Sequence, residues 1–193
     1  MKLIIASNNA HKIREIREIL GSRFDPILTL REAGINHETV EDGVTFLENA
    51  RKKAREIAEI SGCAALADDS GISVDALGGA PGVYSARYCG MHGDDEGNND
   101  LLLKNLEGQT DRRAHYTAAI VIAYPDGRTV EAEGYLYGTI GTERIGTGGF
   151  GYDPLFFPEG SSRTLAEYTA EEKNAISHRA EGLRALLSHL CEA

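Results

Sequence analysis

Short apolar runs alternate with amphipathic segments along this chain, and turn residues separate the two kinds of segment. The apolar runs at 2–6, 24–30 and 64–67 predict buried strands. Between them, apolar residues recur at helical spacing over 10–20 and 45–60, which predicts two amphipathic helices. The first third of the chain is therefore expected to form strands connected by helices.

The second half of the chain predicts a long hairpin followed by a helix. Strand-like segments at 116–124 and 128–140 flank Pro125-Asp126-Gly127, whose Asp-Gly pair favours a tight turn. Another helix is expected over 94–106, and leucines at helical spacing predict one at the C-terminus. Strands that alternate with helices, together with an antiparallel hairpin, predict an α/β fold with a mixed sheet.

Length, charge and cysteine usage narrow the possible function classes. A chain of 193 residues suits one domain with a substantial core, so we expect a single domain over residues 1–193. The net charge of −10 argues against non-specific binding to nucleic acid or to an anionic membrane. Cys63, Cys89 and Cys191 show no zinc-binding spacing, and the first apolar run is too short for a signal peptide. These features predict a cytoplasmic protein with no nucleic-acid or membrane partner.

Two adjacent acids, Asp68 and Asp69, follow the apolar run 64–67 and precede Ser70-Gly71. This order places the acids at the end of a predicted strand, where α/β folds often bind ligands. Two ionised carboxylates about 4 Å apart repel by roughly 1–4 kcal/mol, and a cation such as Mg²⁺ would remove that repulsion. A surface turn is the alternative, because Asp, Ser and Gly are turn residues.

The segment Ser7-Asn8-Asn9-Ala10-His11-Lys12 lies between the first strand and the first helix. A helix N-terminus presents free amides and a partial positive charge, so this segment is a candidate phosphate-binding site. It lacks the glycines of a Walker loop. Simple capping of the helix by Ser7 or Asn8 is the alternative.

On the second helix, Asn49 and Lys53 are four residues apart and share a face outside the apolar stripe. Glu41 and Asp42 precede this helix in a polar loop and could supply a metal-binding oxygen. A solvated helix face and an exposed acidic loop explain the same residues without a site.

The loop at 146–154 is rich in glycine and carries two aromatic residues. Glycine permits close approach of backbone to a ligand, and Phe150 or Tyr152 could stack on a base, an interaction worth about 1–3 kcal/mol. The same aromatic rings could instead belong to the hydrophobic core.

Lys173, His178 and Arg179 place three cationic or donor groups in a short stretch of an acidic protein. On one continuous helix, Lys173 would point away from the other two. A shared pocket for all three therefore predicts a break near Ser177. A solvated helix face is the alternative.

Taken together, these segments resemble the inosine triphosphate pyrophosphatase family, and the likeness extends over nearly the whole chain. The matching segments are Ser7–Lys12, Thr45–Ala50 with Lys53, Ala67–Tyr88, Gly146–Pro154 and Lys173–Arg179. The resemblance implies hydrolysis of the non-standard purine nucleoside triphosphates ITP, dITP and XTP to the monophosphate and pyrophosphate, which removes them from the nucleotide pool. It also implies a two-lobed single domain around a long curved mixed sheet flanked by helices, with the active cleft between the lobes, and a homodimer.

The resemblance further assigns roles to residues. Asp69 is expected to act as general base and Mg²⁺ ligand, with Glu41 as second metal carboxylate and Glu38 or Asp42 as alternatives. The expected substrate-binding residues are Ser7, Asn8, Asn9, Ala10, His11, Lys12 and Ser70 at the phosphates, Phe150, Gly151, Tyr152, Asp153, Lys173, His178 and Arg179 at the base and sugar, and Lys53 in the cleft. Asn8 stands where many relatives have glycine, and asparagine tolerates a left-handed backbone.

Selectivity for a 6-oxo purine is expected from donors on His178 and Arg179, because adenine presents an amino group at that position. A pyrophosphatase for pyrimidine nucleotides, as in the similarly folded Maf-like proteins, is one alternative. A nucleotide-binding sensor without catalysis is another. The segment from Ile176 to Arg179 favours the purine enzyme, and the presence of Asp69 and Lys12 argues against the sensor.

Overall fold

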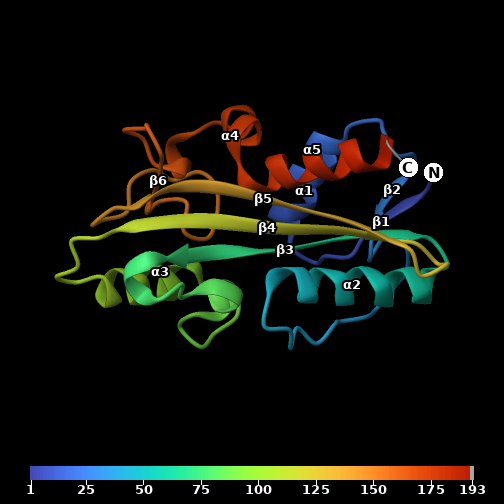
Figure 1. The fold of residues 1–193 in the computed structure, drawn as a ribbon, viewed down its shortest axis with the longest axis horizontal. Coiled ribbons are helices and arrows are strands. Elements are labelled where there is room, and N and C mark those ends of the chain that lie inside the picture. Colours follow the sequence, from blue (N-terminus) through green and yellow to red (C-terminus); the bar gives the residue numbers. More distant parts are fainter. Residues whose placement is uncertain (192–193) are drawn as a thin grey trace. The chain divides into compact units, whose positions relative to one another are not determined.

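The computed structural model describes residues 1–191, which form helices and strands in the predicted alternation (Figure 1). Their order is β1 (Leu3–Ile5), α1 (Ala10–Leu20), β2 (Ile27–Thr29), α2 (Phe46–Ser61), β3 (Ala64–Val74), the 3₁₀ helices η1 (Asp75–Leu77) and η2 (Gly82–Arg87), α3 (Asp95–Asn105), β4 (Arg113–Ala123), β5 (Thr129–Ile140), β6 (Phe156–Pro158), the 3₁₀ helix η3 (Leu165–Glu167), α4 (Ala170–Ile176) and α5 (His178–Cys191). Within residues 1–191, no helix is both long and apolar enough to span a bilayer.

The strands form one mixed sheet in the order β2-β1-β3-β4-β5-β6. Strand β1 pairs in parallel with β2 and β3, with Leu3 opposite Ile27 and Ala64, and β5 pairs antiparallel with β6. Strands β4 and β5 form the predicted hairpin around the Asp-Gly turn, where the Gly127 amide donates to the carbonyl of Tyr124. The predicted α/β fold with a mixed sheet flanked by helices is thus confirmed.

The chain divides into two compact units. Unit 1 comprises residues 1–69, 118–134 and the segment from 178 onward, and unit 2 comprises residues 70–117 and 135–177. The division falls within β3, β4 and β5, so each of these strands contributes residues to both units.

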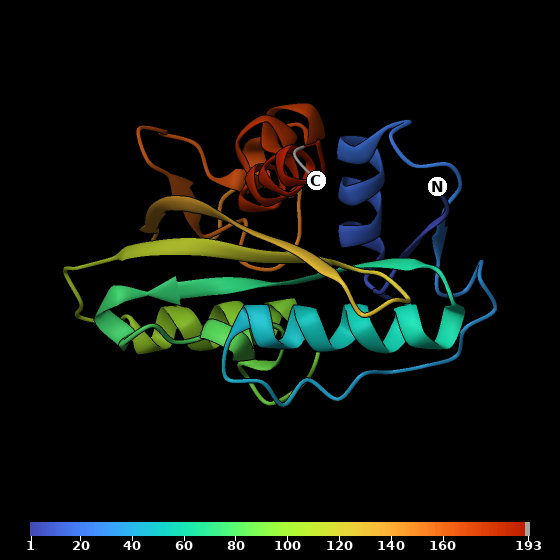
Figure 2. The same cartoon turned by 45° about the vertical axis from the view of Figure 1, so that its right-hand side comes forward.

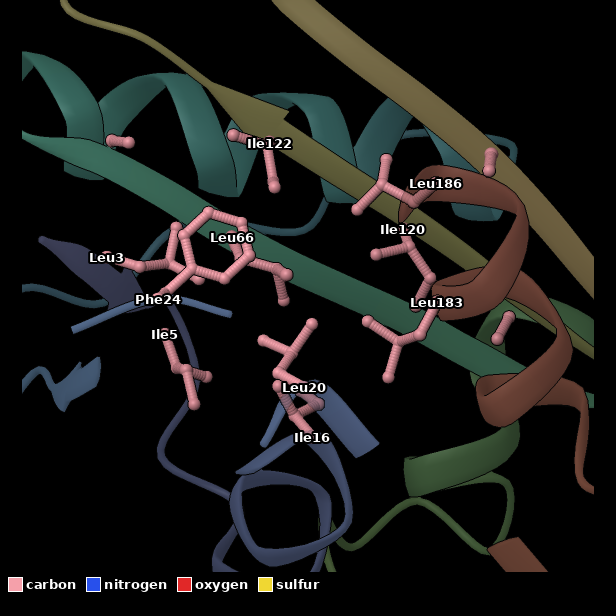
Figure 3. Close-up of a cluster of buried hydrophobic side chains, with 13 residues drawn as sticks. Leu3, Ile5, Ile16, Leu20, Phe24, Leu66, Ile120, Ile122, Leu183 and Leu186 are labelled. Atoms are coloured by element: carbon pink, nitrogen blue, oxygen red, sulfur yellow. The ribbon is translucent and has the colours of Figure 1, made fainter. Parts of the chain in front are cut away.

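Unit 1 has two apolar layers because side chains alternate along its strands. Leu66 and Ile120 point to one face, where they pack against Ile16 of α1 and Leu183 of α5 (Figure 3). Ala65, Ala67 and Val121 point to the other face and pack against α2. Both overall views place α2 on one side of these strands and α1 on the other (Figure 2).

Local sequence signals set the ends of the unit 1 helices. Asn9 accepts hydrogen bonds from the amides of His11 and Lys12 and so begins α1, and Thr45 accepts from Glu48 N at the start of α2. Helix α2 ends at Gly62, whose φ of 61° lies in the left-handed region that glycine adopts without strain. The helices predicted over 10–20 and 45–60 are confirmed within one residue at each end.

Strand β3 differs from its prediction. The expected strand stopped at Ala67 before an acidic turn, whereas β3 continues through Asp68 and Asp69 to Val74. Both acids are buried and bonded to charged groups from other elements, so the strand can bury them without breaking. The interpretation of this dipeptide as a surface turn is therefore wrong. Strand β2 is also shorter than predicted, because only Ile27–Thr29 pair with β1.

Unit 2 has its own aromatic core. Tyr116 of β4 contacts Phe156 of β6 edge-on, with ring centroids 4.8 Å apart, and Leu102 of α3 and Ile72 of β3 belong to the same cluster. Helices α3 and α4 lie on opposite faces of the strands of this unit (Figure 1). Burial of Leu102 therefore fixes α3 to the strands of this unit.

A break between α4 and α5 falls where the sequence predicts one. Thr169 and Glu172 form a capping box at the start of α4. Ser177 has extended backbone, with φ −65° and ψ 151°, and α5 begins at His178. Lys173 and His178 consequently do not share one continuous helix.

Close approach of α5 to β5 requires glycine at position 134. A Cβ atom at Gly134 would overlap the carbonyl oxygen of His178 and the amide nitrogen of Gly182. The contact is backbone against backbone, so a side-chain rotation cannot relieve it.

We expect Gly134→Ala to lower the free energy of unfolding by about 1–3 kcal/mol, because the added methyl group must displace the backbone of α5. Urea unfolding measures this difference. Thr139→Ala, on the exposed side of the same strand, is the control and should change stability by less than about 0.5 kcal/mol. Equal effects of the two substitutions would contradict the close-packing account.

Candidate active site

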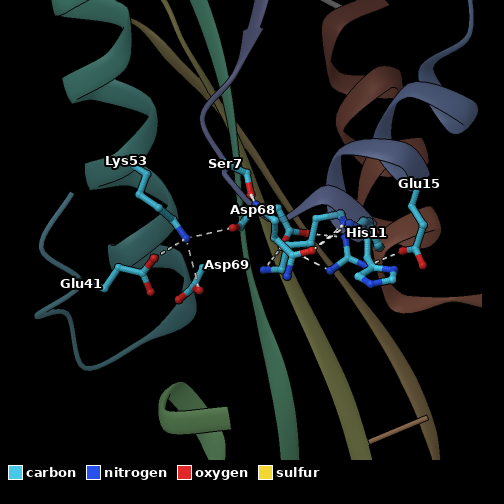
Figure 4. A network of polar contacts seen from close by, with 10 residues as sticks. Ser7, His11, Glu15, Glu41, Lys53, Asp68 and Asp69 are labelled. Carbon is cyan, nitrogen blue, oxygen red and sulfur yellow. Dashed lines mark hydrogen bonds and ion pairs between the residues drawn. The ribbon is translucent and has the colours of Figure 1, made fainter. Parts of the chain in front are cut away.

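Asp68 and Asp69 are neighbours on β3 and point to opposite sides of the strand (Figure 4). This follows from the alternation of side chains along a strand. Asp68 points toward α1 and α5, and Asp69 points toward α2. The two carboxylates have separate partners, so mutual repulsion does not define the site as the sequence suggested.

Asp68 belongs to a buried network of four charges. Lys12 Nζ lies 2.6 Å from Asp68 Oδ1, and Arg179 Nε lies 2.9 Å from Asp68 Oδ2. Arg179 Nη1 also donates to Glu15 Oε2 at 2.5 Å. The Arg179 side chain is only 1% exposed, so its two carboxylate partners replace the water it has lost.

The network shifts the pKa values of Asp68 and Arg179 toward their charged forms. Burial by itself would raise the pKa of Asp68, but the nearby charges of Arg179 and Lys12 outweigh it, and the pKa is strongly lowered. Burial would likewise lower the pKa of Arg179, but Asp68 and Glu15 outweigh it and raise the pKa. Asp68 is therefore a permanent anion in the folded protein.

Asp69 faces Lys53 and Glu41 on the α2 side of β3 (Figure 4). Lys53 Nζ lies 3.0 Å from Glu41 Oε1, 3.4 Å from Asp69 Oδ1 and 3.0 Å from the Asp68 carbonyl oxygen. The second oxygen of Asp69, Oδ2, is buried and has no hydrogen-bond partner among residues 1–191. This carboxylate therefore keeps an acceptor for another group.

The pKa of Asp69 is raised, in contrast to that of Asp68. Burial is the main cause and the negative charge of Glu41 adds to it, whereas Lys53, Lys12 and the side-chain amide of Asn49 oppose it. For Lys53, burial would lower the pKa, but Asp69 and Glu41 outweigh it and raise the pKa. Asp69 thus binds a proton more tightly than an ordinary aspartate does, while Lys53 stays charged beside it.

Among the three acids considered for the second metal carboxylate, Glu41 is the one placed beside Lys53. The side chain of Glu38 is exposed, and Asp42 pairs with Lys52 at 2.8 Å. Within residues 1–191, the protein groups no three acidic, histidine or cysteine side chains in a metal-binding arrangement. Glu41 and Asp69 nevertheless form the kind of two-carboxylate donor set that Mg²⁺ uses together with substrate phosphates.

The segment Ser7–Lys12 caps α1, but through Asn9 and not through Ser7 or Asn8 as the alternative interpretation proposed. Asn9 Oδ1 accepts from the amides of His11 and Lys12, and Ser7 Oγ accepts from the amide of Asn9 (Figure 4). Lys12 directs its ammonium group to Asp68. Asn8 does not use the left-handed backbone that asparagine tolerates, since every positive φ within residues 1–191 belongs to a glycine.

In unit 2, Lys173 and Asp153 form a second buried pair. Lys173 Nζ lies 2.7 Å from Asp153 Oδ2, and the Phe150 amide donates to the same oxygen at 3.0 Å. The Lys173 ammonium also lies 4.6 Å from the centre of the Phe150 ring, which is cation–π geometry. A Cβ atom at Gly149 would overlap the Asp153 carboxylate, so the loop needs glycine there.

The remaining predicted residues have other surroundings. Tyr152 is 4% exposed, packs in the core of unit 2 and donates its hydroxyl hydrogen to the Ser85 carbonyl. Its ring is therefore a core ring, and the expectation that Tyr152 stacks on a base is wrong for this structure. Ser70 is half-buried on β3, and His178 is buried at the start of α5.

Sequence reasoning missed Glu15. It lies three residues after Lys12, so the two share a face of α1, and this spacing was the available signal. Its partner Arg179 is 164 positions away, and no local pattern connects them. Residues predicted for the site thus form two groups, one in unit 1 around Asp68 and Asp69 and one in unit 2 around Asp153.

Comparison with known proteins identifies the family. The model of the Ham1 family matches residues 3–189. The chain belongs to the Ham1 family. It is 49% identical to the dITP/XTP pyrophosphatase of Streptomyces coelicolor, covering 96% of this chain and 95% of the relative. The same identity holds for the dITP/XTP pyrophosphatase of Clostridium perfringens, over 98% and 97% of the two chains.

The fold agrees with that of a solved Ham1 structure. The Ham1 protein of Staphylococcus aureus superimposes with a TM-score of 0.90 at 37% identity, covering 100% of this chain and 99% of that one. The resemblance stated from the sequence motifs is therefore confirmed over nearly the full chain.

The opposite pKa shifts of the two acids predict opposite effects on stability. Asp68→Asn should lower the free energy of unfolding by about 3–5 kcal/mol at neutral pH, because it removes the partner of a buried Arg179. The folded-state pKa of Asp68 is lowered, so its contribution is present above the unfolded pKa and is lost as the pH falls. The difference between the variant and the parent should therefore shrink below about pH 4. Urea unfolding across this pH range provides the measurement.

Asp69→Asn is the matched variant on the same strand. Because the folded-state pKa of Asp69 is raised, protonated Asp69 stabilises the fold at low pH. This contribution to the free energy of unfolding is lost as the pH rises through the folded-state pKa. This variant should therefore be at least as stable as the parent protein at neutral pH. A loss as large as that of Asp68→Asn would show that the two acids do not have separate electrostatic roles.

Proposed function

We propose that this protein hydrolyses non-standard purine nucleoside triphosphates, namely ITP, dITP and XTP, to the monophosphate and pyrophosphate. The general class, a hydrolase acting on nucleoside triphosphates, is confirmed by its full-length similarity to enzymes of that name. The structural observation that carries the proposal is the buried Asp69, with its unpartnered Oδ2 and its raised pKa, beside Glu41 and Lys53.

Asp69 is the general base in this proposal. A water oxygen forms a bond to the α-phosphorus, the bond from that phosphorus to the bridging oxygen of the β-phosphate breaks, and the water proton moves to the Asp69 carboxylate. A raised pKa makes a carboxylate a stronger base, provided that it is ionised at the working pH. Lys53 supports the ionised form, because its ammonium lies 3.4 Å from Asp69 Oδ1.

Lys12 is proposed to bind the phosphates. Asp68 holds the ammonium of Lys12 at 2.6 Å and accepts one of its three N–H bonds. The other N–H bonds can be donated to phosphate oxygens, which carry developing negative charge as pyrophosphate leaves. Asp68 thereby orients the cation and acts on the substrate only through it.

Glu41 and Asp69 would hold a divalent cation, for which we propose Mg²⁺. The fit rests on two carboxylates that meet at Lys53 and on the buried Asp69 Oδ2, which has no partner among residues 1–191. When bound, the cation supplies neutralisation of the triphosphate charge. Lys53 links the two carboxylates and keeps them at one place.

Phe150, Asp153 and Lys173 of unit 2 are proposed to bind the base and sugar. Phe150 offers a ring for stacking, and Lys173 is fixed beside it by Asp153. His178 remains the proposed 6-oxo donor. Arg179, expected to share that role, is 1% exposed with its guanidinium bonded to Asp68 and Glu15, so we assign it to holding Asp68. The single domain with its active cleft, the homodimer and the cytoplasmic location also remain proposals.

Asp69→Asn should reduce kcat for ITP by at least about a hundredfold, because the amide cannot accept the proton, while nucleotide binding is retained. Stopped assays of pyrophosphate release measure kcat. In the metal-free protein, the pKa of Asp69 should lie above the ordinary aspartate value of about 3.9, since burial raises it, and an NMR titration of the carboxyl carbon measures this. Asp75→Asn, a half-exposed acid that follows the same strand, is the control and should keep normal turnover. Turnover near the parent rate in Asp69→Asn would rule out the general-base role.

Pyrophosphate release from ITP, XTP, dITP, ATP, GTP and UTP, measured in parallel with Mg²⁺, tests the substrate class. We expect turnover of the first three to exceed that of the others by at least about a hundredfold, since mismatched buried donors cost about 1–3 kcal/mol each. A preference for UTP would favour the pyrimidine enzyme instead. Binding of nucleotides without any release would favour the sensor.

A further inference from the structure

Two polar residues of α3 hold the glycine-rich loop of unit 2 at Gly151. The Gly151 amide donates to Asp95 Oδ2 at 2.7 Å, and the Gly151 carbonyl accepts from Asn99 Nδ2 at 2.9 Å. Asp95 and Asn99 are four residues apart, so they share one face of the helix. Together they fix the main chain on both sides of a single residue.

The two hydrogen bonds to Gly151 affect Phe150, because Gly151 follows it directly in the chain. The amide bonded by Asp95 belongs to the peptide group that joins Phe150 to Gly151, so it sets the backbone rotation that orients Phe150. Gly151 has φ +62°, a conformation that other residues adopt only with strain. On the other side of Phe150, its own amide is bonded to Asp153. The backbone of Phe150 is therefore held from both directions.

Packing alone does not account for these two side chains. Asn99 is 2% exposed, and its Oδ1 is buried without a hydrogen-bond partner among residues 1–191. An unpaired buried acceptor costs free energy that an apolar side chain of similar size would avoid. Tyr152 already anchors the loop in the core through its ring and its bond to Ser85. The α3 contacts therefore add a constraint on backbone direction at Phe150 and Gly151.

We propose that Asp95 and Asn99 are positioning residues for recognition of the purine base. They act through Gly151 to hold the Phe150 ring at the Lys173 ammonium, so that the ring presents a fixed stacking surface. The inference rests on the proposed function, because it assigns the base to Phe150. It assigns a role to two residues that contact the loop from α3, a helix that carries none of the residues predicted for the site.

Binding to a catalytically silent background tests the proposal. In an Asp69→Asn background, Asp95→Ala and Asn99→Ala should each weaken ITP binding about three- to tenfold, the effect of one lost hydrogen bond. Binding of inorganic tripolyphosphate, which has no base, should not change. Asp95→Asn should restore ITP binding, because its Oδ1 still accepts from the Gly151 amide. Lys104→Gln, an exposed substitution on the same helix, is the control and should change neither affinity. Isothermal titration calorimetry measures all of these affinities.

Unchanged ITP binding in both alanine variants would overturn the proposal, as would an equal loss for ITP and tripolyphosphate, which indicates a general structural defect. A second measurement does not depend on the substrate. The chain contains no tryptophan, so Phe150→Trp introduces a single indole at the loop. Its fluorescence anisotropy should fall when Asp95→Ala is added and stay high with Asp95→Asn. If Asp95→Ala leaves the anisotropy unchanged, the positioning role is refuted even if ITP is not the substrate. If the parent enzyme fails to hydrolyse ITP, only the proposed function is refuted.

Discussion

The buried ion pair between Asp68 and Arg179 is the interaction on which the unit 1 site depends. It connects β3 to α5, and the contacts of Glu15 and Lys12 add α1 to the same network. Two acids and two bases balance each other there, so no net charge is buried. Such a network contributes less to stability than apolar packing of the same volume would, but removal of one member leaves an uncompensated charge. The arrangement therefore fixes the position of Lys12 more than it strengthens the fold.

The alternation of side chains along β3 gives the two adjacent acids, Asp68 and Asp69, different surroundings. Because adjacent residues face opposite sides of β3, Asp68 meets two cations, whereas Asp69 meets one lysine and a second acid. The first carboxylate becomes a fixed anion and the second a more basic one. A structural counter-ion and a group able to take a proton are thus built from the same residue type at neighbouring positions, with environment as the only difference.

In unit 2, a buried carboxylate likewise pairs with a cation, at the glycine-rich loop. Asp153 neutralises Lys173 and also accepts from the Phe150 amide, so one carboxylate sets both the cation and the backbone beside it. Close packing explains the glycines, because Gly149 has no room for a side chain next to Asp153.

The sequence alone determined the local features: the helices begin at Asn9 and Thr45 because their side chains cap free amides, and the hairpin forms at its Asp-Gly turn. The motifs also identified the family, because the residues of each motif are close together in the sequence and can be recognised without the structure. Tertiary structure alone decided that β3 runs through both acids and that Arg179 is buried against Asp68 and Glu15. The contacts of Arg179 join charges more than 100 residues apart, whose pairing compensates for lost hydration, and no local period records such a pairing.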